Sequence, residues 1–200
     1  MRPQAGAPRR VIGFVFLTIF LDLVGFGIVL PLMPFYVKSM GGTAETLGWL
    51  LSLFSVTQLL ATPFLGRLSD RFGRRPVILL SLVGNAAAMV VFAIATNVRW
   101  LALLFASRTL AGATSGNLSA CQAAVADVTQ GEARAKGMGL VGAAIGLGFV
   151  LGPVLGSLLA GIGPWAPPLG AAALAAVDVV AAFFFMPETR HMSDSAGPRI

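Results

Sequence analysis

Six long apolar stretches follow one another along the 200-residue chain, separated by short polar breaks. Each is close to the roughly 20 residues that an α-helix needs to cross the hydrocarbon core of a bilayer. They lie at about 11–33, 46–66, 76–97, 100–121, 137–161 and 166–186. The pattern predicts an all-α membrane protein with six transmembrane helices. Residues 11–187 would form this bundle, between an N-terminal segment at 1–10 and a polar tail at 188–200.

Prolines mark several of the expected helix ends. Pro31 and Pro34 close the first stretch, and Pro187 closes the last. Pro76 stands at the first turn of the third stretch, where a missing backbone N–H costs little. These positions support the boundaries read from hydrophobicity.

The amino-acid composition also indicates a protein that lies in a lipid membrane. The chain is 56% hydrophobic and only 11% charged, whereas soluble domains are about a quarter charged. So few charges cannot cover a water-facing surface, so the lipid bilayer is the expected solvent. The net charge of +6 could suit nucleic acid, but the arginines sit at the ends of apolar runs and form no basic face, so no nucleic-acid partner is expected.

The densest charge lies in the break at 66–76, which holds Arg67, Asp70, Arg71, Arg74 and Arg75. Lys and Arg in short loops stay on the cytoplasmic side of a membrane. If the N-terminus is cytoplasmic, the inside collects eleven of the fourteen Lys and Arg residues and the outside two. We therefore expect a multi-pass protein of the inner (plasma) membrane with both termini in the cytoplasm.

Three ionisable side chains interrupt the apolar stretches: Asp22, Arg108 and Asp178. Such groups are costly inside a bilayer and usually functional. A carboxylate there can be kept protonated by desolvation and released by a nearby cation, as a proton carrier requires. Asp22 and Arg108 are the main candidates for proton coupling or substrate contact. The alternative is a buried pair that only fixes helix packing, and Asp178 could simply hydrogen-bond across helices.

Gln58, Asn85 and Asn117 are uncharged polar residues within the same stretches. Hydrogen bonding between helices is their simplest role, although Gln58 is also a candidate for the substrate or proton pathway. No metal-binding or nucleotide-binding motif occurs. The sequence therefore indicates neither an enzyme nor an ATP-driven pump, and no cofactor is expected beyond a proton gradient.

The charged break resembles the signature loop of the Major Facilitator Superfamily, G-x-L-x-D-R-x-G-R-R. The matching residues are Gly66, Leu68, Asp70, Arg71, Gly73, Arg74 and Arg75. Arg108 to Gly112 is similar to the R-x-x-x-G motif of the fourth helix. A glycine pattern is similar to the antiporter motif of the fifth helix, with Ser157 in place of its final glycine. It comprises Gly139, Gly148, Gly152, Pro153 and Gly156.

The resemblance implies the N-terminal half of a twelve-helix transporter, most similar to the drug/proton antiporters of the tetracycline-resistance type. It implies proton-coupled efflux of a drug-like hydrophobic compound. Asp22 and Arg108 would then line a central cavity, and Asp70, Arg71 and Arg74 would latch the cytoplasmic side. The fifth-helix glycines and Pro153 would contact a second six-helix half. Tetracycline exporters of this type commonly carry an acid in the third helix, which the stretch 84–88 lacks.

Two alternatives remain open. The chain could be a truncated or inactive membrane fragment, or an interaction subunit, because it stops after six helices. It could also be a metabolite uptake carrier of the same superfamily. In every case the expected partners are the lipid bilayer, a small-molecule substrate, and a second half supplied by a missing segment or by another copy.

The sequence also predicts two specific contacts. Asp127 follows the fourth stretch at the cytoplasmic end of that helix, near the plane of the charged break, so Arg71 or Arg74 should pair with it. Gly148, Gly152 and Gly156 recur every four residues and should share one helix face.

Overall fold

The computed structural model describes residues 7–186, with side chains described from residue 11 onward. Within this part, all regular structure is helical, which agrees with the all-α prediction. The elements are α1 (Ala7–Val29), the 3₁₀ turn η1 (Leu30–Leu32), α2 (Met33–Ser39), α3 (Ala44–Phe72), α4 (Arg74–Val98), α5 (Leu101–Ala113), α6 (Asn117–Val128), α7 (Gly131–Ala160) and α8 (Ala166–Phe185). The expected tail at 188–200 lies outside the described residues, and α1 begins within the segment expected to precede the bundle.

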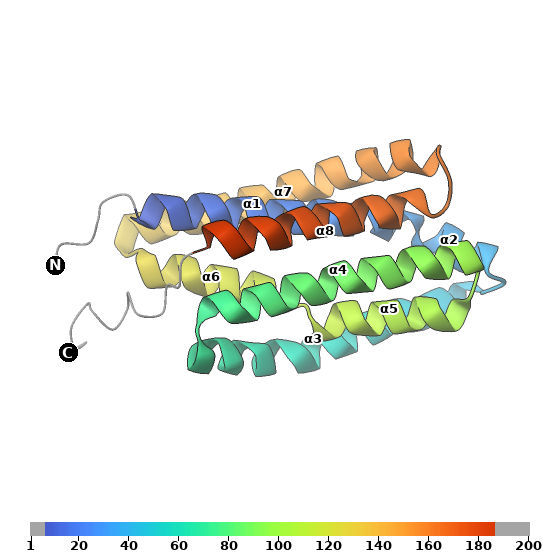
Figure 1. Cartoon of the computed structure of the whole chain (residues 1–200), viewed down its shortest axis with the longest axis horizontal. Coiled ribbons are helices and arrows are strands. Elements are labelled where there is room, and N and C mark those ends of the chain that lie inside the picture. The colour runs from blue at the N-terminus through green and yellow to red at the C-terminus, as the bar shows by residue number, and fades with distance from the viewer. Residues whose placement is uncertain (1–6, 187–200) are drawn as a thin grey trace.

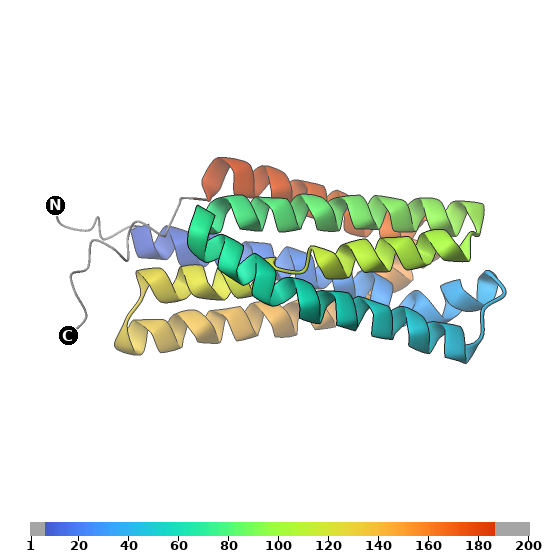
Figure 2. The same cartoon turned by 90° about the horizontal axis from the view of Figure 1, so that it is seen from below.

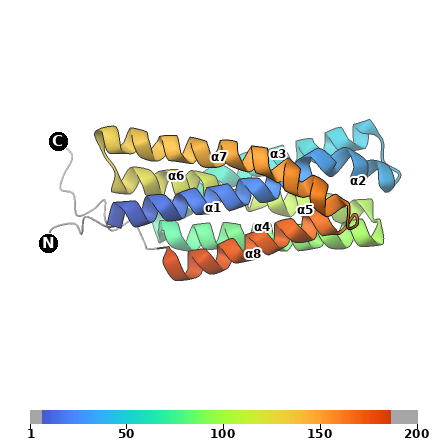
Figure 3. The ribbon, with the colours of Figure 1, turned by 90° about the horizontal axis from the view of Figure 1, so that it is seen from above.

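The helices run side by side along one axis (Figure 1). The α3–α4 and α6–α7 connections and the start of α1 lie at one end, which we call the basic end because Arg71, Arg74 and Arg75 lie there. The α2–α3, α4–α5 and α7–α8 connections lie at the other end (Figure 2). Seen from above, α1 lies between α7 and α8, beside α6 (Figure 3).

Five segments of the described chain are long and apolar enough to span a membrane. They are Val11–Ser39, Ala44–Phe72, Arg74–Val98, Gly131–Ala160 and Ala166–Phe185. α5 and α6 follow one another along the bundle and together make the fourth crossing in chain order, which brings the total to six (Figure 2). The prediction of one continuous helix at 100–121 is therefore wrong, because that crossing is built from two short helices.

The break between α5 and α6 has a local cause in the run Thr114-Ser115-Gly116. The Thr114 hydroxyl donates to the carbonyl of Leu110 at 2.9 Å, and the Ser115 hydroxyl donates to that of Ala111 at 2.7 Å. Such bonds compete with the helical backbone pattern, and the glycine that follows is a poor helix former. Irregular backbone at membrane depth is tolerated where it borders a cavity, and this one does, as described below.

The charged break at 66–76 is shorter than the sequence suggests. α3 continues through Phe72 and α4 begins at Arg74, so Gly73 alone separates them. Gly73 has φ 106° and ψ 159°, a region open almost only to glycine. Asp70 and Arg71 therefore belong to the last turns of α3. The expected end of the first helix at Pro31 and Pro34 is also wrong. Pro31 lies in η1 and Pro34 lies in the first turn of α2, which continues to Ser39.

The glycine face of α7 packs against α1 within this half. A Cβ atom added at Gly152 would lie 2.6 Å from the Cα of Gly27, and one at Gly156 would lie 2.5 Å from the carbonyl oxygen of Ile28. Gly148 meets Leu23 in the same way. The three glycines do share one face, but the expected contact of this face with a second half is wrong, because α1 already covers it.

Candidate functional site

A cavity of about 160 Å³ lies between α1, α3, α4 and the broken crossing. Its wall combines apolar side chains with a few polar ones. The apolar residues are Leu23, Phe26, Phe54, Met89, Ala111 and Leu118. The polar residues are Asp22, Gln58, Asn85, Arg108, Thr114, Ser115 and Asn117. An apolar pocket with a few convergent polar groups is typical of small-molecule sites.

Asp22 is held by amides from two other helices. Its Oδ1 accepts a hydrogen bond from Asn85 Nδ2 on α4 at 2.8 Å, and its Oδ2 accepts one from Asn117 Nδ2 on α6 at 2.6 Å. Both amides are neutral, so they fix the orientation of the carboxyl group without cancelling its charge. Asn85 and Asn117 do bond between helices, as expected, and their shared partner is the acid of the cavity.

Arg108 lines the same cavity from α5 and is 2% exposed. Its Nη2 atom donates a hydrogen bond to the sulfur of Met89 at 3.7 Å, and its guanidinium carbon lies 4.8 Å from the centre of the Phe92 ring. The Nε atom is buried without a hydrogen-bond partner. Thus a cation stands in an apolar wall with only soft partners, although burying an uncompensated charge is costly.

Asp22 and Arg108 face one cavity but do not pair with each other. Among the described residues the ion pairs join Arg74 to Asp70, Arg74 to Asp127, and Lys136 to Glu132. The alternative in which Asp22 and Arg108 form a buried packing pair therefore does not describe this structure. Both groups keep capacity for a further partner.

The remaining pathway candidates separate. Gln58, a candidate for the substrate or proton pathway, lies on the cavity wall. Asp178 does not line the cavity and is 1% exposed inside the bundle. Its Oδ1 accepts a hydrogen bond from the Thr18 hydroxyl at 2.9 Å.

The broken crossing is the part of the site that the sequence analysis missed. Thr114, Ser115 and Asn117 come from the break or the residue after it, and all three line the cavity. The break also directs the start of α6 toward α1, so that Asn117 can reach Asp22. The available signal was the Thr-Ser-Gly run inside an otherwise apolar stretch.

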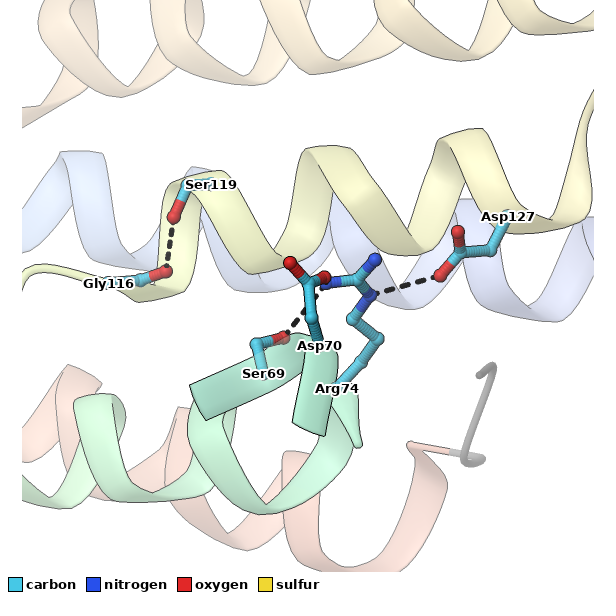
Figure 4. A network of polar contacts seen from close by, with 6 residues as sticks. All are labelled: Ser69, Asp70, Arg74, Gly116, Ser119 and Asp127. Atoms are coloured by element: carbon cyan, nitrogen blue, oxygen red, sulfur yellow. Dashed lines mark hydrogen bonds and ion pairs between the residues drawn. The ribbon is translucent and has the colours of Figure 1, made fainter. Parts of the chain in front are cut away.

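At the basic end, Arg74 joins three residues from two helices (Figure 4). Its Nε donates to Asp127 Oδ2 of α6 at 3.0 Å. Its Nη1 donates to Ser69 Oγ at 3.2 Å and to Asp70 Oδ1 at 2.6 Å. The predicted pairing with Asp127 is therefore present and is made by Arg74. Asp70 is 67% exposed and is also bound by this arginine.

Other basic side chains hold helix ends in the same region. Arg75 Nη2 donates to the carbonyl oxygen of Phe183 in the last turn of α8 at 2.6 Å. Arg134 Nη2 donates to the carbonyl oxygen of Ala126 near the end of α6 at 2.7 Å. A cation beside free carbonyl groups at a helix C-terminus is favourable. Hydrogen bonds from arginine side chains therefore join the helix ends to one another at the basic end of the bundle.

The other motif residues have simpler surroundings. Gly66 and Gly139 would each accept a Cβ atom with nothing within 4 Å. Arg71 lies with its guanidinium carbon 5.4 Å from the centre of the Phe72 ring. Pro153 lies inside α7, with its ring beside Gly27 of α1.

Comparison with known proteins places this geometry in a family. The family model described as Major Facilitator Superfamily matches residues 15–199. The tetracycline resistance protein, class C, of Escherichia coli is 42% identical over 175 residues, which are 86% of this chain and 43% of that protein. Multidrug resistance protein 2 of Bacillus subtilis (strain 168) is 34% identical, over 94% of this chain and 47% of that protein.

A solved structure agrees. The crystal structure of the human organic anion transporter MFSD10 (TETRAN) matches with a TM-score of 0.78 and 35% identity, over 92% of this chain and 48% of that one. The chain thus spans a little under half the length of the relatives named here. The motifs, the six-crossing helical fold and the family match agree, and the chain belongs to the Major Facilitator Superfamily of membrane transporters.

Proposed function

We propose that this chain forms one half of a proton-coupled transporter that exports a drug-like hydrophobic compound across the inner membrane. The observation that carries the proposal is the cavity that holds both Asp22 and Arg108 without an ion pair between them. Similarity to tetracycline and multidrug resistance proteins supports the substrate class. Both termini would lie in the cytoplasm, on the side of the basic end.

The size of the cavity supports a second half. Pockets for drug-sized ligands have volumes of about 300–1,000 Å³, whereas this cavity measures about 160 Å³. Another six-helix half facing it would supply the missing wall. We propose that this half is either a further segment of a longer chain or a second copy.

Asp22 is the proposed proton carrier. Its two amide partners can hold the carboxyl group in place in either protonation state, because each amide carries both an N–H donor and a carbonyl acceptor. In the neutral acid one asparagine donates to the carbonyl oxygen, and the other can turn its Oδ1 to accept the new O–H. Binding or loss of a proton then changes the charge of the cavity without removing its acid from position. A substrate that interacts with that charge becomes coupled to the proton.

A second candidate is an uptake carrier for organic anions. Arg108 favours it, since a buried guanidinium with an unpartnered Nε could receive a carboxylate of the substrate. The similarity to a protein described as an organic anion transporter supports it as well. In this account Asp22 would tune the affinity for the anion rather than drive export.

Transport by the complete transporter in inverted membrane vesicles distinguishes the two. An imposed proton gradient, acidic inside, should drive hydrophobic drug-like compounds into the vesicles if the protein is an exporter. In Arg108→Met, the transport of substrates that carry a negative group should then fall more than the transport of neutral ones. Gradient-independent movement restricted to organic anions would favour the carrier instead. If no movement occurs with a second half present, the chain is an inactive fragment or an interaction subunit.

A further inference from the structure

A second acidic side chain is buried away from the cavity. Asp178 stands on the inner face of α8, in line with Ala171, Ala175 and Ala182, all of which are buried. Thr18 is the one hydrogen-bond partner of its carboxyl group among the described residues, and Oδ2 has none. An ionised carboxylate in such surroundings is very costly unless it is paired and hydrogen-bonded.

The layer around Asp178 can be placed from the Asp22 network. Asp22, Asn85 and Asn117 meet at one level of the bundle. One helical turn toward the basic end brings α1 to Thr18, α4 to Ser81 and α6 to Cys121, each four residues away along its helix. All three are at most 1% exposed. Since Thr18 bonds to Asp178, this next layer is the layer of Asp178.

A contact between α4 and α8 independently places Ser81 at about the same level of the bundle as Asp178. Arg75 of α4 binds the carbonyl of Phe183 of α8, and the two helices run in opposite directions. From this contact, Ser81 lies roughly 9 Å along α4 and Asp178 roughly 7.5 Å along α8. The Ser81 hydroxyl is also buried without a hydrogen-bond partner. Two buried polar atoms without a hydrogen-bond partner therefore lie at about the same level of the bundle.

A proton on Asp178 would remove the charge that this burial penalises. The Thr18 hydroxyl can still donate to the carbonyl oxygen of the neutral acid. The other titratable groups facing this layer are Asp22 on α1 and the Cys121 thiol on α6, and neither supplies a positive charge. On α4 the layer contains the neutral Ser81, and Arg75 lies further along, at the end of α8.

We propose that Asp178, held by the hydroxyl group of Thr18, forms a second proton-binding site, one helical turn from Asp22 on the side of the basic end. The ligand is a proton alone, and its release leaves a carboxylate at Asp178. The inference rests on the proposed function in one respect, that such a proton would belong to the same coupling. It predicts two buried acids per half with separate protonation.

Infrared difference spectroscopy tests the site without transport. The full chain, labelled with ¹³C at the aspartate carboxyl carbon, would be reconstituted in lipid nanodiscs at neutral pH, where an ordinary aspartate is ionised. We expect the carbonyl band of a protonated aspartic acid. The band should persist in Asp22→Asn and in Glu45→Gln, which removes an exposed acid at the opposite end, and vanish in the double variant Asp22→Asn/Asp178→Asn.

If Asp178→Asn impairs folding, Thr18→Val gives the same decision. Loss of the Thr18 donor should shift the band toward that of a carbonyl group with one hydrogen bond fewer. The proposal is overturned if the Asp22→Asn chain shows no such band, or if Thr18→Val leaves the band unmoved. Either result leaves the proposed export function standing, because that function depends on Asp22.

Discussion

Replacing Gly152 by alanine is expected to force α1 and α7 apart. The added Cβ would lie 2.6 Å from Gly27 Cα, 2.7 Å from Gly27 C and 2.9 Å from the carbonyl oxygen of Val24, whereas ordinary contacts begin at 3.4 Å. All three atoms are backbone, so no side chain can rotate away. The two helices must separate by most of an ångström along the longest contact in the bundle.

Overpacking of this kind costs about 1–3 kcal/mol, and the gain in helix propensity from glycine to alanine returns about 1 kcal/mol. The net loss should be at most about 2 kcal/mol, and relative to an alanine substitution that makes no clash the loss should be about 1–3 kcal/mol. For a chain of this size, each kcal/mol corresponds to about 2–4 °C in the midpoint of thermal unfolding. The assay is thermal unfolding of the detergent-solubilised chain, followed by the loss of its monodisperse peak in size-exclusion chromatography.

The same helix supplies the matched control. A Cβ at Gly139 would have nothing within 4 Å, so Gly139→Ala should be neutral or slightly stabilising. The reasoning is refuted if Gly152→Ala and Gly139→Ala unfold at the same temperature. In that case α7 would not pack on α1 through its glycine face.

Three further predictions concern the two ends of the bundle. Asp127→Asn should destabilise the chain by about 2 kcal/mol, because it removes the negative charge from a mostly buried hydrogen bond to Arg74. Asp70→Asn should cost at most about 1 kcal/mol because Asp70 is largely exposed; equal midpoints of unfolding for the two variants would contradict this. Gly73→Ala should cost about 1–3 kcal/mol, since φ 106° is strained for any side chain, and an unchanged midpoint would argue against the single-residue turn. In intact cells, Lys38→Cys should react with a membrane-impermeant maleimide and Lys136→Cys should not, as the charge distribution requires; the reverse pattern would invert the topology.

Much of the fold could be predicted from hydrophobic runs alone, because the bilayer requires long apolar helices. The pairing of Arg74 with Asp127 was also accessible, since complementary charges end two helices in one plane. The break at Thr114-Ser115-Gly116 was not, because a polar run of three residues inside an apolar stretch fits a continuous helix equally well. The local hydroxyl bonds that favour the break also occur within continuous helices, so they do not by themselves show that Asn117 will reach Asp22 of α1.

The candidate site shows the same division. Ionisable residues within apolar stretches identified Asp22 and Arg108, because lipid makes such residues costly. The sequence could not show that Asp22 bonds Asn85 and Asn117 while Arg108 stays apart, because that depends on helix rotation. The glycine face of α7 was correct as a face and wrong as to its partner. Small residues indicate close approach of a helix without naming which one.

Proton movement coupled to substrate tests the central claim most directly. The complete transporter would be reconstituted in liposomes with a pH-sensitive dye inside, and a gradient of a hydrophobic drug-like substrate would be imposed. The account predicts that substrate flow drives protons the opposite way in the unmodified protein and in Glu45→Gln, and that Asp22→Asn abolishes this proton movement while the protein remains folded in the membrane. Undiminished proton movement in Asp22→Asn would contradict the assignment of Asp22 as the coupling residue.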